Sequence, residues 1–160
     1  MLYRLYQPED FAALYAIEEV CFEPPFRFSR ATLRRLTASA HAATWIAEED
    51  GTMAGFALVE WGDAGGDPTG SIVAYIQTIE VAPENRRLGI GGELMRRVEH
   101  SAQAAGARTI WLHVDAENAS AVRLYEAHGY RHQGREANYY PRGRAALIYA
   151  KPLERPSEAG

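Results

Sequence analysis

Cysteine and lysine are almost absent from this chain of 160 residues, which has one of each, Cys21 and Lys151. A single cysteine excludes an internal disulfide, and its place in a helical pattern among apolar residues predicts a buried small hydrophobic side chain. There is no lysine-rich run and the net charge is −4. Both observations argue against nucleic acid as the main partner.

Long apolar runs and metal-binding patterns are also missing. No stretch approaches the roughly 20 apolar residues that a membrane-spanning helix needs. Residues 1–4 show neither the basic region nor the apolar core of a signal peptide, so we expect a cytoplasmic protein with no membrane partner. No cluster of cysteine and histidine suggests a metal. The 47% hydrophobic content is typical of one globular domain with a substantial core.

Apolar periodicity and turn signals predict the order β-α-α-β-β-β-α-β-α-β-β, a mixed α+β arrangement with a helical crossover between the fourth and fifth strands. Strands are expected over residues 3–6, 44–49, 53–61, 71–81, 109–114, 130–138 and 145–151, and helices over 8–21, 29–37, 89–105 and 118–128. Ser29 and Asn118 are candidate N-caps, and Asp50-Gly51 predicts a hairpin turn. The glycine-rich segment 62–70 predicts a mobile loop, and 154–160 a frayed tail after a domain of residues 1–153.

An anion cradle is predicted where the fourth strand passes into the third helix. Arg86, Arg87, Gly89, Gly91 and Gly92 stand where that helix should begin. Glycine lets the backbone approach an anion closely, the first helical N–H groups have no partner in the helix, and the helix dipole is positive there. Guanidinium groups add donors that match phosphate oxygens.

Two common phosphate motifs do not fit this stretch. A P-loop ends in Gly-Lys-Ser/Thr, whereas residues 91–93 are Gly-Gly-Glu. A dinucleotide fingerprint needs a small residue where Leu94 stands. The pattern Arg86-x-x-Gly89-x-Gly91 instead resembles the acetyl-CoA signature of the GNAT superfamily of N-acetyltransferases.

Residues 118–130 strengthen this resemblance. They are similar to the family segment Asn-x-x-Ala-x-x-Leu-Tyr-x-x-x-Gly-Phe, with Tyr130 in place of the phenylalanine. The resemblance implies a single-domain GNAT (acyl-CoA N-acyltransferase) fold, a mixed central sheet with helices on both faces, and acetyl-CoA as co-substrate. It further implies that Tyr125 protonates the departing CoA thiolate; the alternative is a tyrosine of the core. Asn118 is expected to face CoA or an active-site water, or else to serve only as an N-cap.

The resemblance also assigns the residues that would hold the co-substrate. The strand backbone near Ile79 and Val81 would bond to the pantetheine arm. The pyrophosphate would lie against the segment made up of Arg86, Arg87, Leu88, Gly89, Ile90, Gly91 and Gly92.

A base is needed because an amine acceptor arrives protonated, with a pKa of roughly 8 for an α-amine and about 10.4 for lysine. Bacterial ribosomal-protein N-terminal acetyltransferases usually carry glutamate at the strand position of His113. The segments around Tyr75 and His113 more closely resemble eukaryotic-type N-terminal acetyltransferases that act on Met-initiated peptides. There a tyrosine and histidine pair binds a water that carries the proton. The alternative for His113 is a partly buried strand histidine bonded to a neighbour.

The resemblance also assigns the residues that would line the binding site for the acceptor amine. Tyr139 and Tyr140, within Asn-Tyr-Tyr-Pro, are similar to paired tyrosines that line a slot for a peptide N-terminus; the alternative is packing at a strand end. The opposite wall is expected from the loop with Phe22, Pro24, Pro25 and Phe26, which could also be an ordinary turn.

The sequence thus predicts an acetyl-CoA-dependent N-acetyltransferase that acts on a protein or peptide N-terminal α-amine. One alternative is acetylation of a small amine such as a polyamine, amino acid or antibiotic. Acidic groups such as Glu23 and Glu136 lining a closed pocket would favour it. A second alternative is a non-catalytic acyl-CoA-binding sensor.

Overall fold

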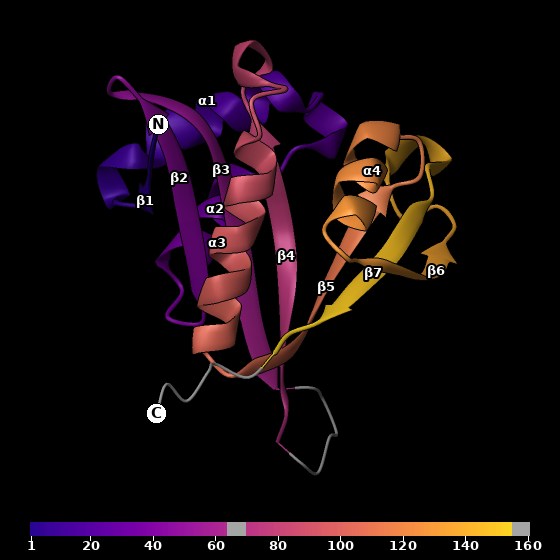
Figure 1. Ribbon diagram of the computed structural model, residues 1–160. Helices are drawn as coiled ribbons and strands as arrows, with labels where there is room; N and C mark the ends of the chain where they lie inside the picture. Colours follow the sequence, from indigo (N-terminus) through magenta and orange to yellow (C-terminus); the bar gives the residue numbers. More distant parts are fainter. Residues whose placement is uncertain (64–69, 155–160) are drawn as a thin grey trace, which may run out of the picture. The chain divides into compact units, whose positions relative to one another are not determined.

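A computed structural model describes residues 1–63 and 70–154. The elements occur in the order predicted from the sequence (Figure 1). The strands are β1 (Leu2–Leu5), β2 (Ala42–Glu49), β3 (Thr52–Asp63), β4 (Ile72–Val81), β5 (Ala107–Asp115), β6 (Arg131–Glu136) and β7 (Ala146–Pro152). The helices are α1 (Phe11–Cys21), α2 (Arg30–Ala38), α3 (Ile90–Ala104) and α4 (Ala119–Ala127).

The observed boundaries correct several predicted ones. The first helix is preceded by a separate 3₁₀ turn, Pro8–Asp10, and β6 ends at Glu136 because Asn138 adopts a left-handed φ of 56°. The predicted mobile loop begins later than expected, since β3 continues to Asp63; its residues 64–69, and the tail from 155 on, lie outside the described residues. Within the described ranges, no helix is long and apolar enough to cross a membrane.

One seven-stranded sheet has the order β1-β2-β3-β4-β5-β7-β6, so the mixed sheet is confirmed. Its strands are antiparallel in the pairs β1–β2, β2–β3, β5–β7 and β6–β7, and parallel in β4–β5. The chain forms two compact units, Met1–Glu60 with Gln77–Val98, and Trp61–Ile76 with the residues from Glu99 onward. Each unit is described by itself.

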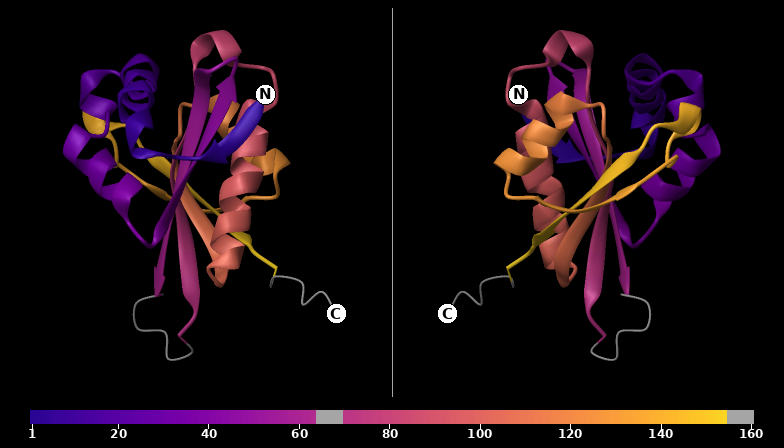
Figure 2. Two further views of the ribbon diagram at one scale, coloured as in Figure 1. Left: turned by 90° about the vertical axis from the view of Figure 1, so that its left-hand side faces the viewer. Right: turned by 90° about the vertical axis from the view of Figure 1, so that its right-hand side faces the viewer.

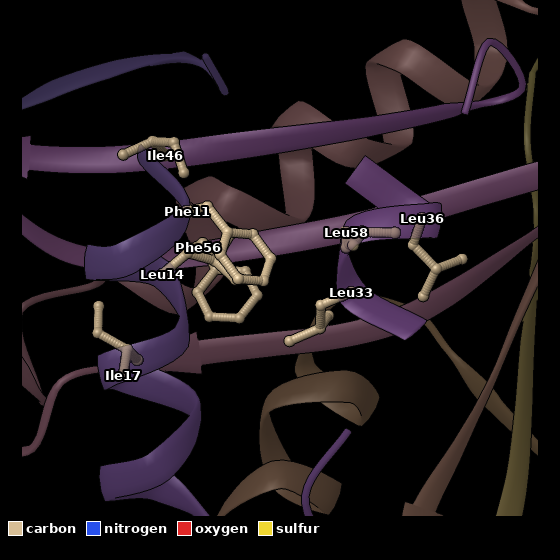
Figure 3. Close-up of a cluster of buried hydrophobic side chains, with 8 residues drawn as sticks. All are labelled: Phe11, Leu14, Ile17, Leu33, Leu36, Ile46, Phe56 and Leu58. Atoms are coloured by element: carbon tan, nitrogen blue, oxygen red, sulfur yellow. The ribbon is translucent and has the colours of Figure 1, made fainter. Parts of the chain in front are cut away.

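The core of the first unit lies between the two amphipathic helices α1 and α2 and the strands β2 and β3. These helices cover one face of the strands, and the first turns of α3 lie on the other face (Figure 2). The core side chains follow helical spacing on α1 and α2 and alternate along β2 and β3. Figure 3 shows them pointing toward one another: Phe11, Leu14, Ile17, Leu33, Leu36, Ile46, Phe56 and Leu58.

Turn and cap chemistry explains where the elements of the first unit begin and end. Asp50 and Gly51 both have positive φ, 51° and 79°, as a two-residue hairpin turn requires, which confirms the predicted turn. Ser29 Oγ accepts a hydrogen bond from the Thr32 N–H at 3.1 Å, so the predicted N-cap of α2 is also confirmed.

The second unit is organised around β5. Its parallel pairing with β4 sets Tyr75 opposite Trp111, and its antiparallel pairing with β7 sets His113 opposite Ile148. Buried and partly exposed residues alternate along β5, with Leu112 and Val114 buried and His113 on the other face. The last strand, β6, is the edge strand beyond β7.

A prediction for the packing of β3 concerns Gly55. A Cβ at this position would lie 2.5 Å from the Glu80 carbonyl oxygen and 3.2 Å from Val81 Cα, both backbone atoms that cannot turn aside. Gly55→Ala is therefore expected to lower the free energy of unfolding in urea by about 1–3 kcal/mol. Gly62→Ala is the matched control on the same strand, because nothing lies within 4 Å of its added Cβ. Equal stability of the two variants would contradict the close approach of β3 and β4.

Candidate active site

Tyr75 and His113 are in direct contact in the second unit. The Tyr75 hydroxyl lies 2.6 Å from His113 Nδ1. The sheet explains the contact, because Tyr75 stands opposite Trp111 and its long side chain reaches the residue two positions further along β5. Burial, with the neighbouring Tyr139 phenol as the second cause, raises the pKa of Tyr75. The phenol is therefore neutral at physiological pH and can donate its proton to the imidazole.

The other ring nitrogen of His113 faces a carboxylate. His113 Nε2 lies 3.1 Å from Glu136 Oε1, and the Tyr139 ring stacks on the imidazole with centroids 4.3 Å apart and planes 3° apart. A carboxylate can only accept a hydrogen bond, so the contact fixes the proton on Nε2 and leaves Nδ1 to accept from Tyr75. His113 is thus oriented by contacts at both nitrogens and on one ring face.

An irregularity in β6 determines which side chain faces His113. The pairing of β6 with β7 passes from His132–Tyr149 directly to Gly134–Ile148, so Gln133 is an extra residue, a β-bulge. After the bulge, Glu136 pairs with Ala146. Directly paired residues project from the same face of a sheet.

This register places Glu136 where its side chain can contact His113. On β7, Ile148 pairs with His113 on one side and Gly134 on the other, and Ala146 pairs with Glu136. Because Ala146 is small, the Glu136 side chain can lean across β7 toward the imidazole. Without the bulge, the alternation would bring Arg135 to this face instead.

Tyr125 lies on α4 in the same unit and is 7% exposed. Burial raises its pKa to about 12, which keeps the phenol protonated at neutral pH, as a general acid for a thiolate must be. Its ring meets Tyr130 edge to face at 5.8 Å, and the Tyr130 hydroxyl donates to Glu99 at 2.7 Å. The tyrosine that replaces the family's phenylalanine therefore ties this helix to a buried carboxylate.

The paired tyrosines lie next to these groups. Tyr139 and Tyr140 contact each other edge to face at 4.8 Å, and the Tyr140 N–H donates to the Arg144 carbonyl at 2.9 Å. The half-buried Tyr140 has a raised pKa, caused first by burial and then by nearby groups that include Tyr125. The structure thus brings together Tyr75, His113, Tyr125, Tyr139 and Tyr140.

Asn118 acts as the N-cap of α4. Its Oδ1 accepts from the Ala121 N–H at 3.2 Å, which confirms the capping interpretation. A role toward CoA or water stays a prediction.

The predicted anion cradle lies in the first unit and has the expected form. Arg87 and Gly89 adopt left-handed φ values of 68° and 77°, and residues 86–89 are exposed. The loop then enters α3, whose first N–H groups have no partner within the helix. Such a turn followed by a helix N-terminus suits a pyrophosphate.

The two arginines of the cradle differ in their surroundings. Arg86 Nε donates to the Val81 carbonyl at 3.1 Å, and its Nη2 lies 3.6 Å from Cys21 Sγ. The Val81 carbonyl also accepts from Cys21 Sγ at 3.7 Å. The prediction of a buried small hydrophobic Cys21 is therefore confirmed only in part: the side chain packs against the core of the first unit, but it is half-buried and its thiol makes polar contacts. Burial, followed by the nearby Glu80 carboxyl, raises the pKa of this thiol.

Two carboxyl groups are buried beside this loop, and sequence reasoning did not identify them. Glu18 is 0% and Glu80 3% exposed. Glu18 Oε2 accepts from the Phe28 N–H at 3.0 Å, and Glu80 Oε2 accepts from Thr78 Oγ1 at 2.8 Å. Burial, and then Glu18, raise the pKa of Glu80 well above its ordinary value. Through its hydrogen bond to the Phe28 N–H, Glu18 fixes the backbone of the α1–α2 loop.

That loop holds the predicted second wall of the acceptor slot. Pro24–Phe26 form a 3₁₀ turn, and the Arg27 side chain donates to the Phe22 carbonyl at 2.7 Å. Pro24 and Pro25 are exposed, and Phe22 and Phe26 are half-buried. Contact of these residues with an acceptor stays a prediction.

With this geometry established, comparisons with known proteins identify the family. Residues 11–130 match the acetyltransferase (GNAT) family. The chain therefore belongs to that family, and its fold is the GNAT fold, as the two sequence signatures predict.

Two curated relatives with different acceptors show comparable similarity. The chain is 37% identical over 83 residues to "[Ribosomal protein bS18]-alanine N-acetyltransferase" of Escherichia coli K12, covering 50% of this chain and 56% of that protein. It is 36% identical over 107 residues to streptothricin acetyltransferase of Streptomyces lavendulae, covering 64% of this chain and 53% of that protein. The chain thus matches little more than half the length of either relative.

Solved structures match over nearly the whole chain. The ribosomal-protein-S18-alanine N-acetyltransferase of E. coli superposes with a TM-score of 0.81 at 27% identity, covering 99% of this chain and 97% of that one. Arabidopsis thaliana NAA60 in complex with a bisubstrate analogue gives a TM-score of 0.84 at 21% identity, covering 97% and 99%. The second likeness shows the fold alone.

A prediction follows from the buried Glu80. Because its pKa is raised in the folded state, its contribution to stability is present at acid pH and is lost as the pH rises above the unfolded value of about 4.3. Glu80→Gln is expected to be more stable than the wild type by about 1 kcal/mol or more in urea at pH 8, a difference that vanishes near pH 4.

The exposed Glu84→Gln is the control for the change in net charge. If Glu80→Gln tracked Glu84→Gln at both pH values, Glu80 would not be buried as a neutral acid.

Proposed function

We propose that this protein is an acetyl-CoA-dependent N-acetyltransferase whose acceptor is a protein or peptide N-terminal α-amine. Family membership supports the transfer reaction. The observation that carries the acceptor assignment is the contact of Tyr75 with His113 beneath the stacked Tyr139. An α-amine needs only a moderate base, because its pKa is roughly 8.

In the proposed reaction, the Tyr75–His113 pair takes a proton from the acceptor ammonium, directly or through a water. The neutral amine then attacks the thioester carbonyl, forming the C–N bond and a tetrahedral oxyanion. Collapse of this intermediate breaks the C–S bond, and Tyr125 protonates the departing thiolate. Holding amine and thioester together supplies much of the rate.

The co-substrate would be held by the first unit. The exposed turn at residues 86–89 and the N-terminus of α3 supply the N–H donors and positive potential that a pyrophosphate requires. Arabidopsis thaliana NAA60, a protein of the same fold, has been solved in complex with acetyl-CoA.

The two relatives are named for acceptors of different classes. The E. coli relative is named for the alanine of ribosomal protein bS18, and the Streptomyces relative for the antibiotic streptothricin. Acetylation of a small amine is therefore the second candidate. Of the two acidic groups named for it, Glu23 and Glu136, the second already contacts His113, which favours the peptide acceptor.

The first experiment supplies acetyl-CoA with peptides that differ in residues one and two, alongside polyamines, amino acids and streptothricin, and detects free thiol. Turnover is expected on peptides with a free N-terminus and is abolished when that amine is blocked. Turnover on a small amine alone would overturn the peptide assignment, and CoA binding with no turnover on any amine would support an acyl-CoA sensor.

A kinetic prediction concerns the base and the acid. His113→Ala and Tyr125→Phe are each expected to lower kcat about 100-fold or more, since general acid–base steps contribute that much. The KM for acetyl-CoA is expected to change little, because neither side chain belongs to the cradle. The measurement is steady-state kinetics with the best acceptor of the panel.

The matched controls are His41→Ala and Tyr6→Phe, at positions that belong to the first unit. Full activity of His113→Ala or Tyr125→Phe would remove that residue from the mechanism.

A further inference from the structure

We infer that Glu136 is a positioning residue for the proton-accepting pair, so that Tyr75, His113 and Glu136 form one relay from the acceptor amine to solvent. This inference rests on the proposed function, because it assumes that Tyr75 and His113 take the acceptor's proton. The sequence predicts His113 together with Tyr75 as the base; the two ring nitrogens of His113 lie 2.6 Å from that phenol and 3.1 Å from the Glu136 carboxylate.

The first step of the argument is the direction of each hydrogen bond. An ionised carboxylate has no proton to donate, so Nε2–H of the neutral imidazole donates to Glu136 Oε1. Nδ1 is then the acceptor and the Tyr75 hydroxyl is its donor. The remaining lone pairs of the Tyr75 oxygen are what an ammonium or a bound water can reach, while neither nitrogen of His113 has a free lone pair.

The second step is the balance of protons. One proton passes from the acceptor ammonium to the Tyr75 oxygen as the phenol proton moves to His113 Nδ1. The result is a neutral amine, a neutral phenol and an imidazolium whose charge faces the Glu136 carboxylate. Buried Tyr75 never becomes a free phenolate. The Nε2 proton later leaves through Glu136 for solvent, and exchange of the ring protons with water restores the Nε2–H form.

The third step is exposure along the three groups. The His113 side chain is 19% exposed and that of Glu136 is 49% exposed. Glu136 therefore connects a half-buried imidazole to bulk water, and it can pass on the proton that accumulates on His113 with each turnover. Carboxylate support of a histidine base is a general device for fixing its tautomer and stabilising its charged form.

The fourth step is the specificity of the placement. The bulge at Gln133 brings Glu136 and not Arg135 to the face of His113, across the small Ala146. A guanidinium at this place would repel the imidazolium and could not accept from Nε2–H. The neighbouring residues of β6 therefore differ in the sign of charge that they would offer to the base.

The test compares Glu136→Ala, Glu136→Gln and Glu136→Asp with the wild type, using acetyl-CoA and whichever amine the acceptor panel selects. Glu136→Ala is expected to lower kcat about tenfold or more with the KM for acetyl-CoA unchanged. Glu136→Gln keeps an acceptor but lacks the charge, so its kcat should fall between; Glu136→Asp should recover part of the loss. Glu49→Ala, an exposed glutamate at the end of β2, is the control and should match the wild type.

A second measurement reports on position directly. Nitrogen NMR of the labelled protein, with the His113 signals assigned by their loss in His113→Ala, should show the Nε2–H form in the wild type. In Glu136→Ala the population of the Nε2–H tautomer should fall. An Nδ1–H form in the wild type, or an unchanged tautomer in Glu136→Ala, would overturn the inference even if no acceptor were turned over.

The outcomes separate this inference from the proposed function. A wild-type kcat in Glu136→Ala together with a large loss of kcat in His113→Ala would contradict the relay but would still support the Tyr75–His113 pair as the base. A wild-type kcat in both His113→Ala and Tyr75→Phe would contradict both the assignment of this pair as the base and the relay. Turnover of a small amine instead of peptides would change the acceptor and leave the relay prediction as it stands.

Discussion

The pairing of β5 with β7 is the constraint on which the candidate active site depends. The register runs without interruption from Thr109–Pro152 to Asp115–Ala146. Because side chains alternate across a sheet, this register sends Leu112 and Val114 into the core and His113 to the opposite face. Both hydrogen-bonding contacts of the imidazole follow from that placement: Tyr75 comes from the parallel neighbour β4, and Glu136 reaches it from the far side of β7.

Much of the fold could be predicted from the sequence because its signals are local. The hairpin at Asp50-Gly51, the cap at Ser29 and the helix start at Asn118 each depend on residues adjacent in the chain. The strand–loop–helix with Arg86 and Gly89 could also be predicted, since positive φ and an unpartnered helix start are local properties.

What could not be predicted depends on registers between distant strands. Glu136 was considered only as a possible wall of a small pocket, because no sequence pattern shows that Gln133 is an extra residue in β6. The same is true of the polar contacts of Cys21, whose apolar neighbours suggested a buried hydrophobic side chain; its contacts to Val81 and Arg86 arise only once α1 and the end of β4 have packed. The pair Glu18 and Glu80 is likewise visible only in three dimensions.

The bulge in β6 has a consequence for how such an enzyme could diversify. An edge strand has one paired neighbour, so gaining or losing a residue there disturbs the ladder on one side only. Removing the extra residue at Gln133 would make the ladder regular and leave Glu136 opposite Ala146, so the acidic side chain would stay beside the imidazole. A slip of the pairing by one residue, with Gln133 retained and placed opposite Ile148, would instead bring Arg135 opposite Ala146 and invert the charge beside the imidazole. The edge strand can thus lose its bulged residue and keep the carboxylate, whereas closing the bulge without that loss would replace it with a guanidinium.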